Sequence, residues 1–209
     1  MIQLKQADFE VFDVEGLEPR MSAIIETVRP KLHQIGAQIA PIWSELTRQD
    51  VFVHVAKHAR RSVNPPKDTW VAWSTAKRGY KALPHLQFGL WRTHAFLQLA
   101  VIYECPGKSM ISDAFLRELE SIQSTIPATF RWSDDHGKPN TIGHSEMNSI
   151  ELERMVSRLH TVKKAELLVG LHLDAQTCDQ LSSQIWEQHI SETLAVLAPL
   201  QRLANEATR

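Results

Sequence analysis

The chain has 209 residues, of which 43% are hydrophobic and 22% charged, and its formal net charge is −1. This balance excludes a mostly disordered chain, and residues 1–209 are expected to form a single domain with a full hydrophobic core. The longest apolar stretch, Ala95 to Tyr103, is too short for a membrane helix, and no signal peptide is visible at the start. With only Cys105 and Cys178, the protein is expected in a reducing cytoplasm, without membrane association.

The first half of the chain predicts a helical segment followed by strands. Apolar residues recur at helical spacing over residues 17–46, and Pro30 and Pro41 should kink or divide that segment. Residues 51–55 are ambiguous because the run is short, whereas 69–74, 82–91 and 94–104 have the composition or alternation of strands. The two residues between the last two strands, Arg92 and Thr93, predict a tight hairpin.

The second half predicts helices and strands in alternation. A helix is expected over 112–126, a short strand over 130–132 and a loop over 134–140. Asn148 has the spacing of a helix cap with Glu151, and residues 167–173 alternate as a strand. Asp174 is then expected to cap a long final helix that Pro199 kinks or ends. The whole pattern predicts an α+β fold: a largely antiparallel sheet of about five or six strands, packed with helices from both ends of the chain.

The near-zero net charge conceals a strong asymmetry. The segment from Arg48 to Arg92 holds nine Lys and Arg residues and only Asp50 and Asp68 as acids, a balance of +7, while the remainder carries −8. Such a segment favours an anionic partner, and the tryptophans and tyrosine within it suit a ligand whose flat rings stack. A solvated basic face with core tryptophans is the alternative interpretation.

The basic segment also carries a family resemblance. The stretches HVAKHARRSVNPPKDTWVAW, KRGYKALPHLQFGLW and IYE, with DFEVF, GLEPRM and RPKL upstream, resemble the YktB-like family of uncharacterised bacterial proteins. The resemblance implies a single-domain cytoplasmic α+β protein and names no activity or cofactor. The architecture it implies is similar to the catalytic fold of biotin ligases and class II aminoacyl-tRNA synthetases, but the glycine-rich GRGRxG loop of biotin ligases is absent here, so that analogy assigns no function.

Several residues of this segment suggest specific chemistry. His54 and His58 would share one face of a helix and hold a metal, but on a strand they would lie about 13 Å apart, and the neighbouring cations disfavour a metal. Arg60 and Arg61 provide paired donors for phosphate or carboxylate, unless one of them pairs with Asp68 or Glu104 instead. No nucleophile motif such as GxSxG is present, so the sequence alone does not predict a reaction.

The function favoured by these residues is binding of a small anion, such as a nucleotide or an acyl phosphate, in a His- and Arg-lined cleft. His85 would be able to act there as a general acid or base. The residues predicted to line the cleft are His58, Arg60, Arg61, Lys81 and His85, with Trp73 or Tyr80 stacking on the ligand. The alternatives are a nucleic-acid-binding module or a protein-docking domain that uses the same basic residues.

Overall fold

The computed structural model describes residues 3–208, and within them seven strands form one antiparallel sheet. The strands follow the order β1-β2-β3-β4-β7-β5-β6. Their bounds are β1 Phe52–Val55, β2 Asp68–Ser74, β3 His85–Trp91, β4 His94–Val101, β5 Phe130–Ser133, β6 Ile142–Gly143 and β7 Leu167–Asp174. The predicted α+β fold with an antiparallel sheet is confirmed. The expected number of strands was too low because β6 has two residues, too few to show an alternating pattern.

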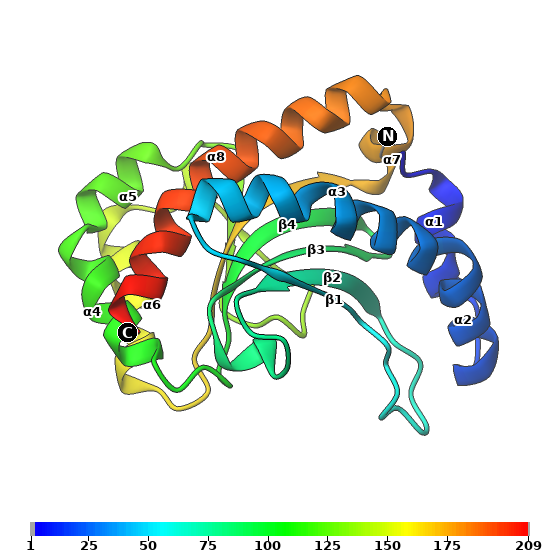
Figure 1. The fold of residues 1–209 in the computed structure, drawn as a ribbon, viewed down its shortest axis with the longest axis horizontal. Helices are drawn as coiled ribbons and strands as arrows, with labels where there is room; N and C mark the ends of the chain where they lie inside the picture. The colour runs from blue at the N-terminus through cyan, green and yellow to red at the C-terminus, as the bar shows by residue number, and fades with distance from the viewer. Residues whose placement is uncertain (1–2, 209) are drawn as a thin grey trace.

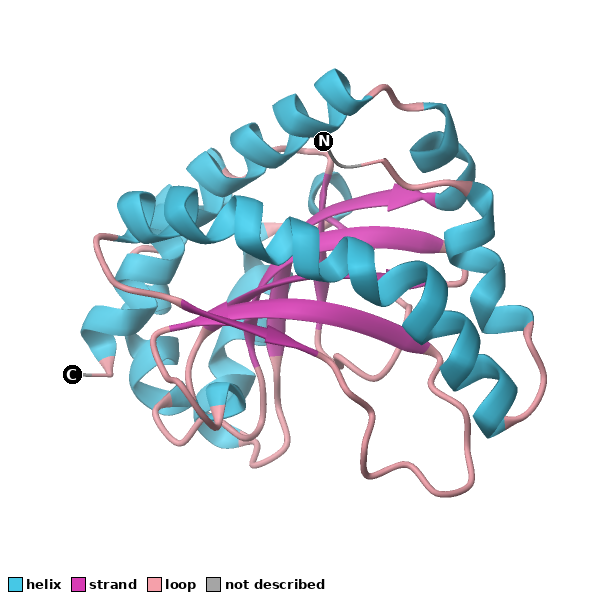
Figure 2. Ribbon diagram, turned by 45° about the vertical axis from the view of Figure 1, so that its right-hand side comes forward, coloured by secondary structure: helices cyan, strands magenta, loops and turns pink. Residues whose placement is uncertain are grey.

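Helices from both ends of the chain cover one face of this sheet. Figures 1 and 2 show α3 and α8 running side by side across it, with α4, α5 and α6 gathered near one end. The helices are α1 Gln6–Glu10, α2 Leu17–Ala23, α3 Arg29–Thr47, α4 Lys108–Arg117, α5 Leu119–Thr125, α6 Ser149–Thr161, α7 Ala175–Gln180 and α8 Ser183–Ala207. Among the described residues, no helix has both the length and the apolar character that a membrane crossing requires.

The two faces of the sheet differ in chemistry. The helix-covered face carries the main hydrophobic core, to which the sheet contributes residues such as Trp73, Phe88 and Leu97. The opposite face carries buried polar side chains: Gln87 of β3 bonds to His85 and to Gln98, whose amide oxygen in turn lies 3.1 Å from His172 Nε2. The second face is therefore the one on which polar chemistry can be built.

Several predicted helix boundaries change in the structure. The segment 17–46 is divided as expected, with Pro30 in the first turn of α3 and Pro41 inside it. The helix expected over 112–126 begins earlier, at Lys108, and breaks at Glu118 into α4 and α5.

The final helical region also differs from the prediction. Asp174 caps only the short α7, and Ser182 begins α8 by accepting a hydrogen bond from the Ile185 N–H. Pro199 does not end α8, which continues to Ala207. The carbonyl that Pro199 leaves without a helical donor belongs to Ala195, an exposed residue, so water can satisfy it.

Candidate functional site

Two adjacent cavities lie over the polar face of the sheet, between the basic loop that joins β1 to β2 and the turn before β3. Their volumes are about 660 and 600 Å³, and they share the side chains of Arg61, Trp70 and Lys81. We call the two together the basic cleft. The larger cavity is lined by Arg20, Arg61, Asn64, Pro65, Lys67, Asp68, Trp70, Lys81, Trp91, His136 and Gly137. The smaller one adds His58, Arg60 and Tyr80, among others.

The loop that supplies His58, Arg60 and Arg61 is set by local backbone bonds. It leaves β1 after the Ala56 N–H donates to the Trp70 carbonyl at 2.9 Å, and it turns where the Arg61 N–H donates to the His58 carbonyl at 3.0 Å. His58 has a φ of 52° at this turn, in the left-handed region. The chain then returns to β2 through the stiff Pro65–Pro66 pair, so that Arg61 lies between the two cavities.

The second wall of the cleft is the 3₁₀ turn Tyr80–Ala82. Gly79 precedes it with a φ of 69°, a conformation that glycine adopts without steric cost. The turn places Tyr80 against the sheet, where its hydroxyl accepts a 2.8 Å hydrogen bond from Trp70 Nε1. Lys81 lies with its ammonium 5.8 Å from the centre of the Trp70 ring. Trp70 is therefore a fixed aromatic surface beside a cation.

The structure corrects the aromatic residue that the sequence assigned to the cleft. Trp73 is 0% exposed, and its Nε1 donates to the Gly36 carbonyl of α3 at 2.9 Å, so it lies on the helix-covered face, away from the cleft. Trp70, three residues earlier on the same strand, points to the opposite face and lines both cavities. Sequence reasoning missed this assignment because each face of β2 carries a tryptophan, Trp70 on one and Trp73 on the other, and the alternation does not show which face the helices cover.

His85 also lies outside the cleft lining. It is 0% exposed, its Nδ1 faces the Leu83 carbonyl at 2.7 Å, and the Tyr80 ring packs edge-on against it at 5.0 Å. Burial lowers the pKa of His85 to about 4, so its imidazole is neutral at physiological pH. His85 therefore packs against Tyr80 and lines neither cavity.

The other predicted residues do line the basic cleft. His58, Arg60, Arg61, Tyr80 and Lys81 all border the smaller cavity. Burial, followed by the charge of Arg61, lowers the pKa of His58 to about 4, so this histidine adds no charge at neutral pH.

The ion pair anticipated for an arginine involves a lysine instead. Lys81 Nζ lies 3.6 Å from Glu104 Oε1, a contact between two partly exposed groups. Both Arg60 and Arg61 are exposed. Guanidinium donors are therefore available at the cleft.

The two histidines considered as metal ligands do not converge. His54 Nε2 lies 2.8 Å from the Ala76 carbonyl, and its ring stacks on Tyr80, whereas His58 Nε2 lies 3.2 Å from Thr69 Oγ1. His54 belongs to β1 and His58 to the loop beyond it, so the shared helix face that a common metal requires is not formed.

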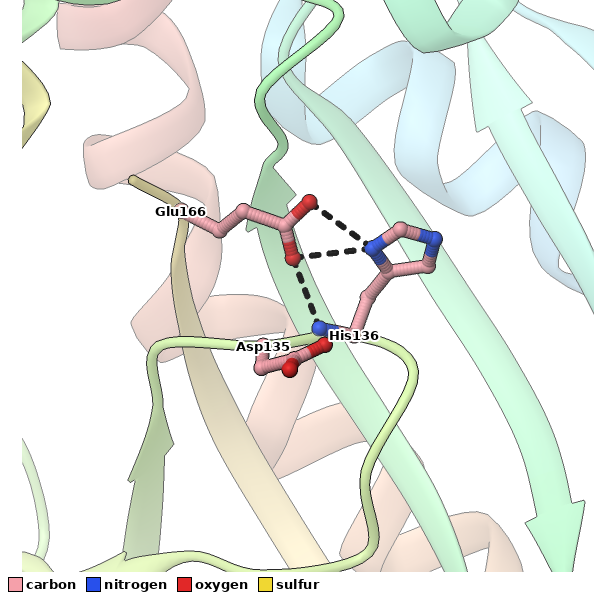
Figure 3. A group of neighbouring side chains, drawn as sticks. All are labelled: Asp135, His136 and Glu166. Carbon is pink, nitrogen blue, oxygen red and sulfur yellow. Dashed lines mark hydrogen bonds and ion pairs between the residues drawn. The ribbon is translucent and has the colours of Figure 1, made fainter. Parts of the chain in front are cut away.

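One pair of functional groups was not predicted from the sequence. His136, in the loop between β5 and β6, directs its Nδ1 to both carboxylate oxygens of Glu166 at 2.8 Å, and its backbone N–H donates to Glu166 Oε2 at 2.7 Å (Figure 3). Glu166 is only 3% exposed and also accepts from the Tyr103 N–H. The bond to Glu166 raises the pKa of His136 above its ordinary value. No motif of neighbouring residues in the sequence indicates this pair, because His136 and Glu166 are 30 residues apart.

Asp135, His136 and Glu166 bring possible metal-ligating atoms within 4.8 Å of one another. Their donors and acceptors are, however, already engaged. Asp135 accepts from the Gly137 N–H at 2.9 Å and pairs with Lys138 at 2.8 Å, while Glu166 accepts the His136 and Tyr103 N–H groups. This is the pattern of a histidine oriented by a carboxylate, and a metal would have to displace these bonds.

One acid shares the larger cavity with the cations. Burial raises the pKa of Asp68 to about 6, although the nearby charges of Arg61, His136 and Lys81 act in the opposite direction. Asp68 is thus a carboxyl group that titrates close to neutrality inside a basic cavity.

Fold and site together define an α+β protein with a basic, aromatic-lined cleft on the polar face of an antiparallel sheet. The chain belongs to the DUF1054 family, described as a domain of unknown function, whose model matches residues 4–201. It is 50% identical over 201 residues to UPF0637 proteins of Bacillus thuringiensis strain Al Hakam and Bacillus cereus strain AH820, covering 96% of this chain and 97% of each relative. The resemblance to an uncharacterised bacterial family is confirmed over nearly the whole chain.

Proposed function

We propose that the protein binds a small anionic ligand, of the nucleotide or acyl-phosphate type, in the basic cleft. The observation that carries this proposal is the convergence of Arg20, Arg61, Lys67 and Lys81 on one cavity of about 660 Å³. These residues come from α2, the β1–β2 loop and the turn before β3. A volume of this size lies within the range of small-molecule sites.

The cleft is held in shape before any ligand binds. Arg20 donates from Nε to the Val14 carbonyl at 2.8 Å and from Nη1 to the Pro66 carbonyl at 3.0 Å, which ties α2 to the basic loop. Trp70 is fixed by its bond to Tyr80. A site whose side chains are already ordered loses less conformational entropy on binding. The ligand class follows from this arrangement: phosphate or carboxylate oxygens would contact the cations, and a flat ring would stack on Trp70.

The concave form of the site favours a small ligand over a nucleic-acid strand or a docked protein. A protein that binds single-stranded nucleic acid without sequence preference needs a long groove that follows the strand backbone, whereas this cleft consists of two short cavities, with Trp70 lining both of them. The nucleic-acid and protein-docking alternatives therefore become outcomes of the experiment.

The test is thermal unfolding of the purified protein with inorganic phosphate, pyrophosphate, adenosine nucleotides, acetyl phosphate and short oligonucleotides, at low and moderate salt. A ligand at a hundredfold excess over its dissociation constant should add about 2.7 kcal/mol of stability. Arg61→Ala removes a charge-assisted donor pair and should weaken the binding roughly 10- to 100-fold. Arg154→Ala, which changes an exposed arginine on α6, is the matched control and should bind normally.

Three results would contradict the proposal. The first is that none of the small anions raises the melting temperature. The second is that Arg61→Ala and Lys81→Ala bind as well as the parent, which would place the anion elsewhere. The third is stabilisation by oligonucleotides alone that disappears with added salt, which would support a nucleic-acid-binding module instead.

A further inference from the structure

The His136–Glu166 pair gives the basic cleft a feature that anion binding does not require. The Glu166 carboxylate accepts hydrogen bonds from the His136 ring and backbone, so the ring nitrogen facing it, Nδ1, carries a proton. The other ring nitrogen, Nε2, points away from Glu166 (Figure 3), and His136 itself lines the larger cavity. This is the orientation in which a histidine exchanges a proton with a bound molecule through Nε2.

The position of Glu166 is itself well fixed. It immediately precedes β7, is almost fully buried, and receives three N–H groups: the His136 backbone and ring and the Tyr103 backbone. An ion pair at the surface is not held by several hydrogen bonds in this way. The other His–carboxylate contact between described residues, His160 with Asp113 at 3.1 Å, joins two exposed groups and provides a contrast.

A second proton-exchanging group lies in the same cavity. Asp68 lines it from the start of β2, together with Arg61 and Lys81. The two groups influence each other, because His136 lowers the pKa of Asp68 and Asp68 raises that of His136. Near neutral pH, Asp68 is therefore mainly ionised and able to accept a proton, while the imidazole is supported in its protonated form.

We propose that the basic cleft hydrolyses a phosphate monoester, with His136 as the general acid, Asp68 as the general base and Glu166 as the residue that positions His136. This inference rests on the proposed anion-binding function and adds a reaction to it. Arg61, Lys67 and Lys81 would hold the phosphoryl oxygens and offset the charge that develops on them. The alcohol part of the substrate, which becomes the leaving group, would lie next to Trp70.

The reaction balances without any further reactant. Asp68 takes one proton from water as the water oxygen bonds to phosphorus. The phosphorus–oxygen ester bond breaks, its electron pair stays on the leaving oxygen, and that oxygen receives the proton from His136 Nε2. The products are the alcohol and hydrogen phosphate, and the proton on Asp68 returns to His136 through solvent, which restores both groups.

The charged groups around His136 set the expected pH dependence. Glu166 just before β7, Asp68 of β2, and Lys81 of the turn before β3 act on it directly, and Asp135 and Lys138 lie in its own loop. Activity should rise with pH as Asp68 ionises near pH 6 and fall at higher pH as His136 loses its proton. Glu166→Gln should move the falling limb to lower pH, because the His136 pKa is raised chiefly by that carboxylate.

The experiment compares steady-state hydrolysis of phenyl phosphate and p-nitrophenyl phosphate. Nitrophenolate leaves without needing a proton, so His136→Asn should lower kcat for phenyl phosphate roughly 100-fold or more and affect the nitrophenyl ester much less. Asp68→Asn should lower turnover of both esters. His160→Asn is the matched control and should leave both rates unchanged.

Calorimetric binding of inorganic phosphate separates this inference from the proposed function. Wild-type protein that binds phosphate but hydrolyses neither ester above the level of the His136→Asn variant would refute the hydrolysis and leave the anion site standing. If wild-type protein does not bind phosphate, neither the proposed anion-binding function nor the hydrolysis is supported. Equal loss on both esters in His136→Asn, with thermal stability unchanged, would show that His136 is not the proton donor.

Discussion

Replacing Trp73 with phenylalanine should lower the free energy of unfolding by about 1.5–2.5 kcal/mol and leave anion binding unchanged. The indole of Trp73 is 0% exposed, and its N–H donates to the Gly36 carbonyl of α3 at 2.9 Å. Phenylalanine lacks this donor, and losing the hydrogen bond costs about 0.5–1.5 kcal/mol, since the Gly36 carbonyl, inside α3, keeps its helical N–H partner. The smaller ring adds the loss of packing, on the order of 1 kcal/mol.

The surroundings of Trp73 explain why relaxation should not recover this loss. A Cβ added at Gly36 would lie 2.6 Å from Val53 Cγ1 and 3.1 Å from Val71 Cγ2, so α3 already sits close against β1 and β2. There is little room for the helix to move and fill the space. The hydrogen bond and the close helix–sheet contact therefore belong to one packed unit.

Trp70→Phe is the matched variant, since Trp70 lies three residues away on the opposite face of β2. It loses the 2.8 Å hydrogen bond to Tyr80 at a partly exposed position, which should cost about 0.5–1.5 kcal/mol. Anion binding should weaken in this variant instead. Urea unfolding gives the stability of both proteins, and phosphate or nucleotide titration gives the affinity. The reasoning would be refuted if Trp73→Phe lost affinity at full stability, or if Trp70→Phe were the less stable of the two.

Two further predictions follow from other parts of the sheet. Gly170→Ala should destabilise the protein by about 3 kcal/mol or more, measured by thermal or urea unfolding, because a Cβ there would collide with the backbone of β4; a loss below 1 kcal/mol would contradict that close approach. Burial lowers the pKa of His85 and His94 to about 4 and that of His172 to about 3, below the unfolded value of 6.5. The unfolded chain therefore takes up more protons, and stability should fall as pH drops from 6.5 towards 5, by up to about 1.4 kcal/mol per pH unit for each histidine. Asp68, whose pKa is raised, opposes this trend in part, and urea unfolding that shows a flat or rising stability over this range would contradict the assignment of the buried histidines.

Features governed by neighbouring residues could be predicted from the sequence alone. The order of strands from 69 to 101, the hairpin at Arg92 and Thr93, and the capping of α6 by Asn148 all agree with the structure. Each depends on side-chain alternation, turn length or a hydrogen bond between residues three apart. The basic segment was also visible, because the residues that carry its charge are close together in the chain.

The composition of the cleft was decided by tertiary structure. Which tryptophan of β2 faces the cleft depends on where α3 packs, since Trp70 and Trp73 lie on opposite faces of that strand. His136 meets Glu166 only because strand pairing places the loop after β5 beside the start of β7. Likewise, α8 continues through Pro199 because the helix is held by its buried side and Pro199 itself is exposed. Local sequence sets which conformations are favourable, whereas contacts between distant segments select the face, the partner and the environment that give a side chain its chemistry.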